Sequence, residues 1–316
     1  ELRIQRRLDR ERFKLPTVEL KNTKTNEVEE SFLGDFYSLY ERRTRDNIGE
    51  LINIVLDAME KANEGKPGGL FRAIDFNSET NLGQTKDRNR RLKTLLEDFA
   101  KPGLDLSDTS EDILGDAYIF LIERFASDAG KKAGEFFTPR KVSEVVAKLA
   151  NPKSGERICD PACGSGSLLL RAGEEVGDGN FQLFGQESNG QTRSLARLNM
   201  LLHKQDGARI DWCDTLNSPT LIESDHLMRF DVVVANPPFS LDKWWGNNDS
   251  EGKPLPDSYK RFTPHMPPKS RGDYAFILHM LAITRPDVAR MAVVAPHGVL
   301  FRSGTEGKIR EKLIRD

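Results

Sequence analysis

The alternation of apolar runs and helical stretches in the second half of the chain most strongly limits its fold. Short apolar runs of strand length cover residues 157–160, 181–187, 209–214, 230–236 and 290–296. Stretches of helical period lie between several of them, at residues 167–175, 191–203 and 274–284. This pattern is typical of a doubly wound parallel α/β sheet. Such sheets bind ligands at the carboxyl ends of their strands, so we expect the functional residues there.

The first part of the chain predicts a different architecture. Apolar residues recur at helical spacing over residues 47–63, 88–100 and 113–125, and a cluster of apolar residues over 32–40 favours one further short helix. We therefore predict a helical N-terminal domain over residues 1–130 and an α/β domain over residues 131–316. A sheet of this kind usually has further strands, and the chain ends inside an expected helix, so we expect this domain to be incomplete at its C-terminus.

Composition excludes several classes of protein. The 316 residues include 47 basic and 49 acidic side chains, and a net charge of −2 gives no general attraction to a nucleic acid. The three cysteines form no CxxC pair and show no ligand spacing with the five histidines, so we predict no metal site. No apolar run is long enough to cross a membrane, and residues 1–12 lack the apolar core of a signal peptide. We expect a cytoplasmic protein.

An acidic, glycine-containing segment joins the predicted strand 157–160 to the next helix. It reads Asp160-Pro161-Ala162-Cys163-Gly164-Ser165-Gly166-Ser167. The two glycines permit a tight turn and a close approach of a ligand to the backbone. The segment matches neither the dinucleotide nor the phosphate-binding glycine pattern. Because the Asp160 carboxylate would repel a phosphate, the segment favours a cationic or amine-bearing ligand; a plain glycine turn is the alternative.

Acidic residues also end the next two predicted strands. Glu187 closes the strand 181–187, where an acidic residue commonly binds the two hydroxyls of a ribose. Asp214 closes the strand 209–214 and could accept a hydrogen bond from the amino group of an adenine. A solvated carboxylate and a helix cap are the respective alternatives.

The most specific motif is Asn236-Pro237-Pro238-Phe239, directly after the apolar run 230–236. The prolines restrict the backbone and remove donors, so nearby carbonyls face the cleft. The Asn236 side-chain oxygen and the Pro237 carbonyl can then accept hydrogen bonds from one aromatic amine. Two such acceptors would localise the nitrogen lone pair, and Phe239 offers a face on which a base can stack.

Together these residues resemble the amino-methyltransferases that use S-adenosylmethionine. More narrowly, the chain resembles the modification (M) subunits of type I restriction-modification systems, which are DNA adenine N6-methyltransferases. Two further segments support the resemblance: residues 134–140 match the family's cofactor-contacting segment, and residues 291–301 match its fifth strand. The resemblance covers residues 47–316 and implies a Rossmann-like methyltransferase sheet.

The resemblance implies a role for each matching residue. The residues that would hold the cofactor, S-adenosyl-L-methionine, are Glu135, Phe136, Phe137, Thr138, Pro139, Arg140, Asp160, Gly164, Ser165, Gly166, Ser167, Glu187 and Asp214. The catalytic residues, which would hold a flipped adenine, are Asn236, Pro237, Pro238 and Phe239. The implied partners are double-stranded DNA, a specificity (S) subunit and a second copy of the M subunit, with a restriction (R) subunit as a further candidate.

The same motif also permits other functions. A transferase with the same motif can methylate N4 of cytosine or a glutamine amide in a protein, although the glutamine enzymes usually have Tyr where this chain has Phe239. A non-catalytic assembly subunit that keeps the cofactor fold is a third possibility, which the intact motif disfavours.

The segment 240–273 is long for a connection between a strand and a helix. It mixes aromatic and basic residues, which suits a flipped base and its flanking phosphates. We therefore expect DNA contacts from Trp244, Trp245, Tyr259, Phe262, Lys243, Lys260, Arg261, Lys269 and Arg271.

Overall fold

The structure is a computed structural model that describes residues 14–22, 24–63, 70–71, 75–102, 111–128, 137–248, 250–251 and 255–315. The chain divides into two compact units, Glu1–Leu114 and Gly115–Asp316. This division lies ahead of the predicted boundary after residue 130, because most of helix α6 (Glu111–Asp128) belongs to the second unit. Within the described residues, no helix is both long enough and apolar enough to span a membrane.

The first unit combines a β-hairpin with helices. Strands β1 and β2 pair antiparallel, and Val18 and Phe32 direct their side chains into the same core as the helices. The prediction of a purely helical domain is therefore wrong for residues 17–33, and Phe32 and Leu33 lie in a strand. The elements are β1 (Thr17–Lys21), β2 (Val28–Leu33), α2 (Phe36–Glu41), α3 (Ile48–Ala62), α4 (Glu79–Leu82) and α5 (Thr85–Phe99).

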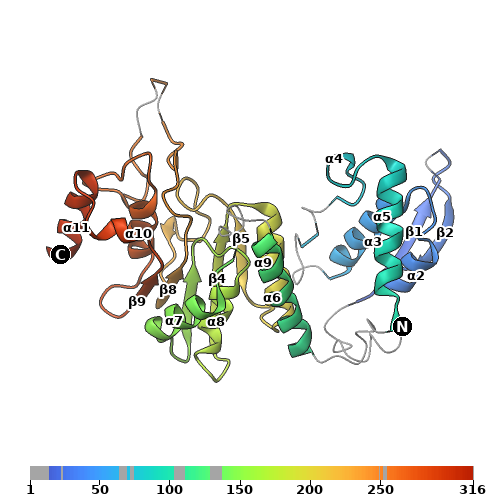
Figure 1. Ribbon diagram of the computed structural model, residues 1–316, viewed down its shortest axis with the longest axis horizontal. Coiled ribbons are helices and arrows are strands. Elements are labelled where there is room, and N and C mark those ends of the chain that lie inside the picture. The colour runs from blue at the N-terminus through green and yellow to red at the C-terminus, as the bar shows by residue number, and fades with distance from the viewer. Residues whose placement is uncertain are drawn as a thin grey trace. The chain divides into compact units, whose positions relative to one another are not determined.

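The second unit is built on a parallel sheet of five strands, which confirms the predicted α/β fold. Its strand order is β5-β4-β3-β8-β9, with parallel pairing throughout (Figure 1). The strands are β3 (Glu156–Asp160), β4 (Phe181–Glu187), β5 (Arg209–Trp212), β8 (Val232–Ala235) and β9 (Arg290–Val293). A short hairpin that the sequence pattern did not predict consists of β6 (Ile222–Glu223) and β7 (His226–Leu227).

Alternate residues of the central strands supply two separate cores. Ile158, Val232 and Val234 pack on one face, whereas Cys159 and Val233 pack on the other. This alternation follows from the two-residue period of a strand, and burial on both faces explains why β8 is continuously apolar. The helices are α7 (Arg140–Ala150), α8 (Ser167–Glu174), α9 (Gly190–Leu202), α10 (Asp273–Ala282) and α11 (Thr305–Arg315), and a 3₁₀ turn covers His297–Leu300.

The strand order sets the position of the site. Strand β3 lies between β4 and β8. After β3, the chain continues to β4 on one side of it, and it reaches β8, on the other side, only later in the sequence. The loops after β3 and β8 therefore diverge at the carboxyl ends of neighbouring strands. Open α/β sheets bind their ligands at such a switch point.

Candidate functional site

The glycine segment after β3 forms a tight turn at the start of α8. Gly164 and Gly166 both have positive φ angles, 54° and 78°. A Cβ atom on Gly166 would lie 2.6 Å from the Met200 side chain, so glycine is required for both backbone conformation and space. The Asn199 side-chain amide donates to the Ser165 carbonyl at 3.0 Å and holds the turn against α9.

Asp160 lies at the base of this turn with 1% of its surface exposed. Its carboxylate accepts a hydrogen bond from the Ala162 N–H at 3.0 Å. Burial, opposed by this bond and reinforced by the nearby charge of Glu187, raises the pKa of Asp160 to about 7. A buried carboxylate with a raised pKa is poised to accept a cation, which would restore its ordinary charge state.

Glu187 links the end of β4 to the glycine turn. One carboxylate oxygen accepts from the Gly164 N–H at 3.0 Å, and the other accepts from the Asn189 N–H at 2.7 Å. Burial raises the pKa of Glu187 above its ordinary value. Two backbone donors therefore orient both oxygens of this carboxylate, and the oxygen that accepts from Gly164 keeps a lone pair for a ligand.

Asp214 has the role of a turn cap. Its carboxylate accepts from the Leu216 and Asn217 N–H groups at 3.0 and 3.1 Å, and from the Asn217 side-chain amide at 2.8 Å. The capping interpretation of Asp214 thus accounts for the local geometry, and a contact between Asp214 and a cofactor adenine stays a prediction.

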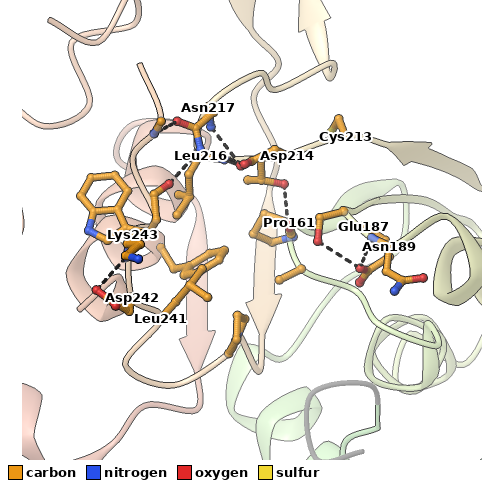
Figure 2. A pocket seen from close by; sticks show the side chains of 17 residues that line it. Pro161, Glu187, Asn189, Cys213, Asp214, Leu216, Asn217, Leu241, Asp242 and Lys243 are labelled. Atoms are coloured by element: carbon orange, nitrogen blue, oxygen red, sulfur yellow. Dashed lines mark hydrogen bonds between the residues drawn. The ribbon is translucent and has the colours of Figure 1, made fainter. Parts of the chain in front are cut away.

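A pocket of about 460 Å³ opens at the carboxyl ends of β3, β4, β5 and β8. Figure 2 shows Glu187 and Asn189 on one side, Leu241 and Lys243 opposite them, and Asp214 between. Three predicted site residues line it: Glu187, Asp214 and Pro238. Two further lining residues, Lys243 and Trp244, were expected to contact DNA. The lining residues that the sequence did not indicate are Pro161, Ala162, Ser188, Asn189, Cys213, Thr215, Leu216, Asn217, Leu241, Asp242, Gly246 and Phe276.

Position in sequence could have identified some of these residues. Ser188 and Asn189 follow a strand directly, and Asn189 caps α9 by accepting from the Gln191 and Thr192 N–H groups. Phe276 had no such signal, because α10 reaches the pocket only through the folding of the sheet.

A buried ion pair stabilises the turn after β5 on the side away from the pocket. Arg261 donates to the carbonyls of Thr215 and Leu216 at 2.9 and 2.7 Å, and pairs with Asp257 at 2.6 Å. The Thr215 hydroxyl donates to the Pro161 carbonyl at 2.6 Å. Arg261 therefore supports the pocket wall from inside the protein.

The expected DNA contacts from residues 240–273 are wrong for the residues that are buried. Trp244, Trp245 and Phe262 pack together at centroid distances of 5.1 to 5.6 Å, and Arg261 is 6% exposed. Tyr259 packs partly buried against the core that includes Phe230. Aromatic and basic residues in alternation do not distinguish a core with a buried ion pair from a binding surface. The residues that stay exposed are Lys243, Lys260, Lys269 and Arg271.

The segment after β8 presents an acceptor and an aromatic face. The Asn236 side-chain nitrogen donates to the Thr138 hydroxyl at 3.2 Å. Among the described residues, no group donates to the Asn236 side-chain oxygen or to the Pro237 carbonyl. Phe239 is 51% exposed, so its ring is accessible to a stacking base. The arrangement can accept an aromatic amine.

A charged cluster holds the chain directly after Phe239. The Ser240 N–H donates to Asp273 at 2.7 Å, and Ser240 has a positive φ of 51°. Asp273 also pairs with Arg302 at 2.7 Å, and Arg302 reaches Glu306 at 3.3 Å. These contacts connect the chain at Ser240 to α10 and, through Arg302, to α11.

The segment ahead of α7 is partly described. Glu135 and Phe136 lie outside the described residues. Phe137, Thr138 and Pro139 precede α7, and Arg140 begins it with an exposed ion pair to Glu144 at 3.4 Å. None of these four lines the pocket of Figure 2, whereas Thr138 contacts Asn236. Across the described ranges, no group of three or more His, Cys, Asp or Glu could hold a metal ion.

The chain is similar to known proteins over most of its length. Residues 109–316 match the family described as N-6 DNA Methylase. The type I restriction enzyme MpnII methylase subunit of Mycoplasma pneumoniae is 36% identical over 301 residues, which are 88% of this chain and 54% of that protein. The chain spans about half the length of the curated relatives it matches.

Solved structures share the fold. The type I restriction-modification methyltransferase subunit of Streptococcus thermophilus has a TM-score of 0.73 and 33% identity, covering 89% of this chain and 59% of that one. A Listeria monocytogenes structure described as a class I S-adenosylmethionine-dependent methyltransferase has a TM-score of 0.54 and 17% identity, covering 89% of this chain and 78% of that one. The second likeness concerns the fold alone.

Proposed function

This chain belongs to the N-6 DNA methylase family, and on that premise we propose that it transfers a methyl group from S-adenosylmethionine to N6 of an adenine in DNA. The observation that carries the proposal is the pair of acceptors at the end of β8, beside a pocket with carboxylates from neighbouring strands. We further propose that the chain acts as the modification subunit of a type I restriction-modification complex, as the names of its relatives suggest.

The residues at the strand ends fit this cofactor. The glycine turn fits closely against α9, since a side chain at Gly166 would collide with Met200. Asp160 would take the cationic methionine part together with Gly164, Ser165, Gly166 and Ser167, and Glu187 would accept from the ribose hydroxyls. Phe137, Pro139 and Arg140, together with Glu135 and Phe136, stay predicted cofactor contacts.

The residues after β8 fit an adenine amine. When bound, the cofactor supplies a methyl group on a positively charged sulfur that leaves as a neutral thioether. Asn236 and Pro237 would accept from the two N–H groups of N6 and stabilise the positive charge that forms on nitrogen, which then loses a proton to solvent. Phe239 would stack on the base and Pro238 would border it. Positioning and these two acceptors supply the catalysis.

The test of the proposal is transfer of tritium from labelled cofactor to DNA by the full-length protein, followed by digestion to nucleosides. N6-methyladenine is the expected product. N4-methylcytosine, a labelled protein glutamine, or no transfer at all would each replace the proposal by one of the alternatives raised from the sequence.

Cofactor affinity is expected to rise as the pH increases from about 6 to about 8. The pKa of Asp160 is raised to about 7, so below that pH a cationic ligand must displace a proton, which weakens binding by up to about tenfold per pH unit. Calorimetric titration across this range measures the slope, and Asp160→Asn, which binds weakly at every pH, should show none. A flat profile in the parental protein would contradict the assignment of Asp160.

The same shift affects the free protein in the opposite sense. Folding raises the pKa of Asp160, so between about pH 4 and pH 7 the folded state holds a proton that the unfolded state has lost. Asp160 should therefore make the protein less stable as the pH rises through this window, and thermal unfolding of the Asp160→Asn variant should lack that component.

We also propose that sequence recognition belongs to a partner. The net charge is −2, and phosphate contacts normally supply much of the affinity for DNA. A specificity subunit and a second copy of the modification subunit are the proposed partners, with a restriction subunit as a further one. We propose that the complex acts in the cytoplasm, where it would meet its DNA substrate.

The isolated protein is thus expected to discriminate between site-bearing and scrambled duplexes by less than about tenfold, or about 1.4 kcal/mol. Gel-shift titration at physiological salt measures this ratio. Full site-specific methylation without a second polypeptide would refute the proposal.

A further inference from the structure

The side-chain amide of Asn236 has one described partner, and that partner comes from a distant part of the sequence. Its nitrogen, Nδ2, donates to the Thr138 hydroxyl oxygen at 3.2 Å across 98 residues. Both side chains are half-buried. Within residues 137–248 and 255–315, no other group bonds to this amide, so Thr138 provides its hydrogen-bonded support.

Thr138 is itself well placed to give that support. The next residue, Pro139, holds its φ at −53° ahead of α7, and the Ser143 hydroxyl donates to the Thr138 carbonyl at 3.3 Å. As a β-branched residue, threonine also has few χ1 rotamers. The hydroxyl is therefore presented from a restricted backbone and a restricted side chain.

The direction of the bond determines what Asn236 can offer to a ligand. An amide has a donor end with two N–H groups and an acceptor end, and one of the two N–H groups of Asn236 donates to Thr138. The acceptor end is then directed away from Thr138 and stays available to an amine. With the amide free to rotate, its NH₂ would face the NH₂ of the target in part of the population, and two donors repel each other.

We propose that Thr138 is a positioning residue for Asn236, which holds the amide so that its oxygen accepts from the target amine. This role differs from the cofactor contact that the family resemblance implies for Thr138. The inference rests on the proposed function for its effect on catalysis, whereas the contact itself can be measured without any reaction.

The test compares Thr138→Val, which has the same shape but no hydroxyl, with Thr138→Ser, which keeps the hydroxyl. The full-length protein with its specificity subunit is assayed under single-turnover conditions at saturating cofactor. The Val variant should lose about tenfold in rate, the free-energy equivalent of about one hydrogen bond. The Ser variant should recover most of that rate, and calorimetry should give both variants a cofactor affinity close to that of the parent.

A double-mutant cycle tests whether Thr138 affects the methylation rate through Asn236. In an Asn236→Ala background, Thr138→Val should cause almost no further loss, because the residue through which Thr138 acts is gone. An equal loss in both backgrounds would overturn the proposal. Unchanged turnover with weakened cofactor binding in Thr138→Val would overturn it too, and would restore the cofactor role.

A spectroscopic readout separates this inference from the proposed function. The side-chain amide resonances of Asn236, identified by their absence in Asn236→Ala, should shift in Thr138→Val and stay close to the parental position in Thr138→Ser. This result is independent of methylation. If the parental protein transfers no methyl group, the proposed function fails; if the resonances do not shift, the positioning role fails.

Discussion

Replacement of Asn236 by alanine is expected to lower the methylation rate by about 100-fold or more while cofactor affinity stays nearly unchanged. The substitution removes one of the two acceptors that face the amine, so the loss falls on the transition state. Asn236 is assigned to the target amine and not to the cofactor, which is why cofactor binding should be insensitive to its loss. Single-turnover methylation and cofactor calorimetry measure the two effects separately.

A matched control for this variant is Asn180→Ala. Asn180 precedes β4, at the opposite end of the strands, where its side chain donates to the Ser154 hydroxyl. The same chemical change there should leave the rate at the parental value. Parental methylation by Asn236→Ala, supplied with the same partner subunits, would disprove the assigned mechanism.

Replacement of Glu187 by alanine is expected to weaken cofactor binding at least tenfold. A hydrogen bond to a charged group contributes about 1.5–3 kcal/mol, so even one lost ribose contact exceeds the energy of a tenfold change. The Gly164 N–H also loses its acceptor, so the glycine turn keeps its bond from the Cys163 N–H to the Gln186 carbonyl but loses its side-chain contact with Glu187. Titration calorimetry measures the affinity.

Two further variants make the result for Glu187 specific. Glu187→Gln should bind almost as weakly as Glu187→Ala, because both carboxylate oxygens accept from backbone N–H groups and an amide can satisfy just one of them. Glu175→Ala changes an exposed glutamate near the end of α8 and should bind cofactor normally. Unchanged affinity in a folded Glu187→Ala protein would remove Glu187 from the cofactor site.

The sequence pattern predicted the structure correctly where residues within one short segment determine its conformation. The run around β8 is apolar because both faces of this strand are buried, and β3, β4 and β8 were all identified within a few residues. The glycine turn was also predictable, since Gly164 and Gly166 occupy backbone conformations that other residues rarely adopt. In contrast, charged residues alternate with few apolar ones over 17–33, and the hairpin there was missed.

Burial of polar and aromatic residues could not be read from the sequence. Arg261 and Trp244 belong to a segment whose composition is typical of a DNA-binding loop. In the structure, Arg261 forms an ion pair with Asp257, and Trp244 packs on Phe262. Asp214 has the position of a ligand contact, yet its carboxylate caps its own turn. In each case, tertiary packing determines which group the side chain contacts. The sequence pattern of one segment does not contain that information.

The sequence by itself determined the order of the parallel strands and helices in the second unit, the conformation of the glycine turn and the identity of the residues that end β3, β4 and β8. These depend on side-chain period and on backbone preferences, which act over a few residues. The tertiary structure alone decided which of those residues meet. The contact between Asn236 and Thr138, and the bond from Gly164 to Glu187, join segments that are brought together because β3 pairs with both β4 and β8 and α7 packs across the sheet.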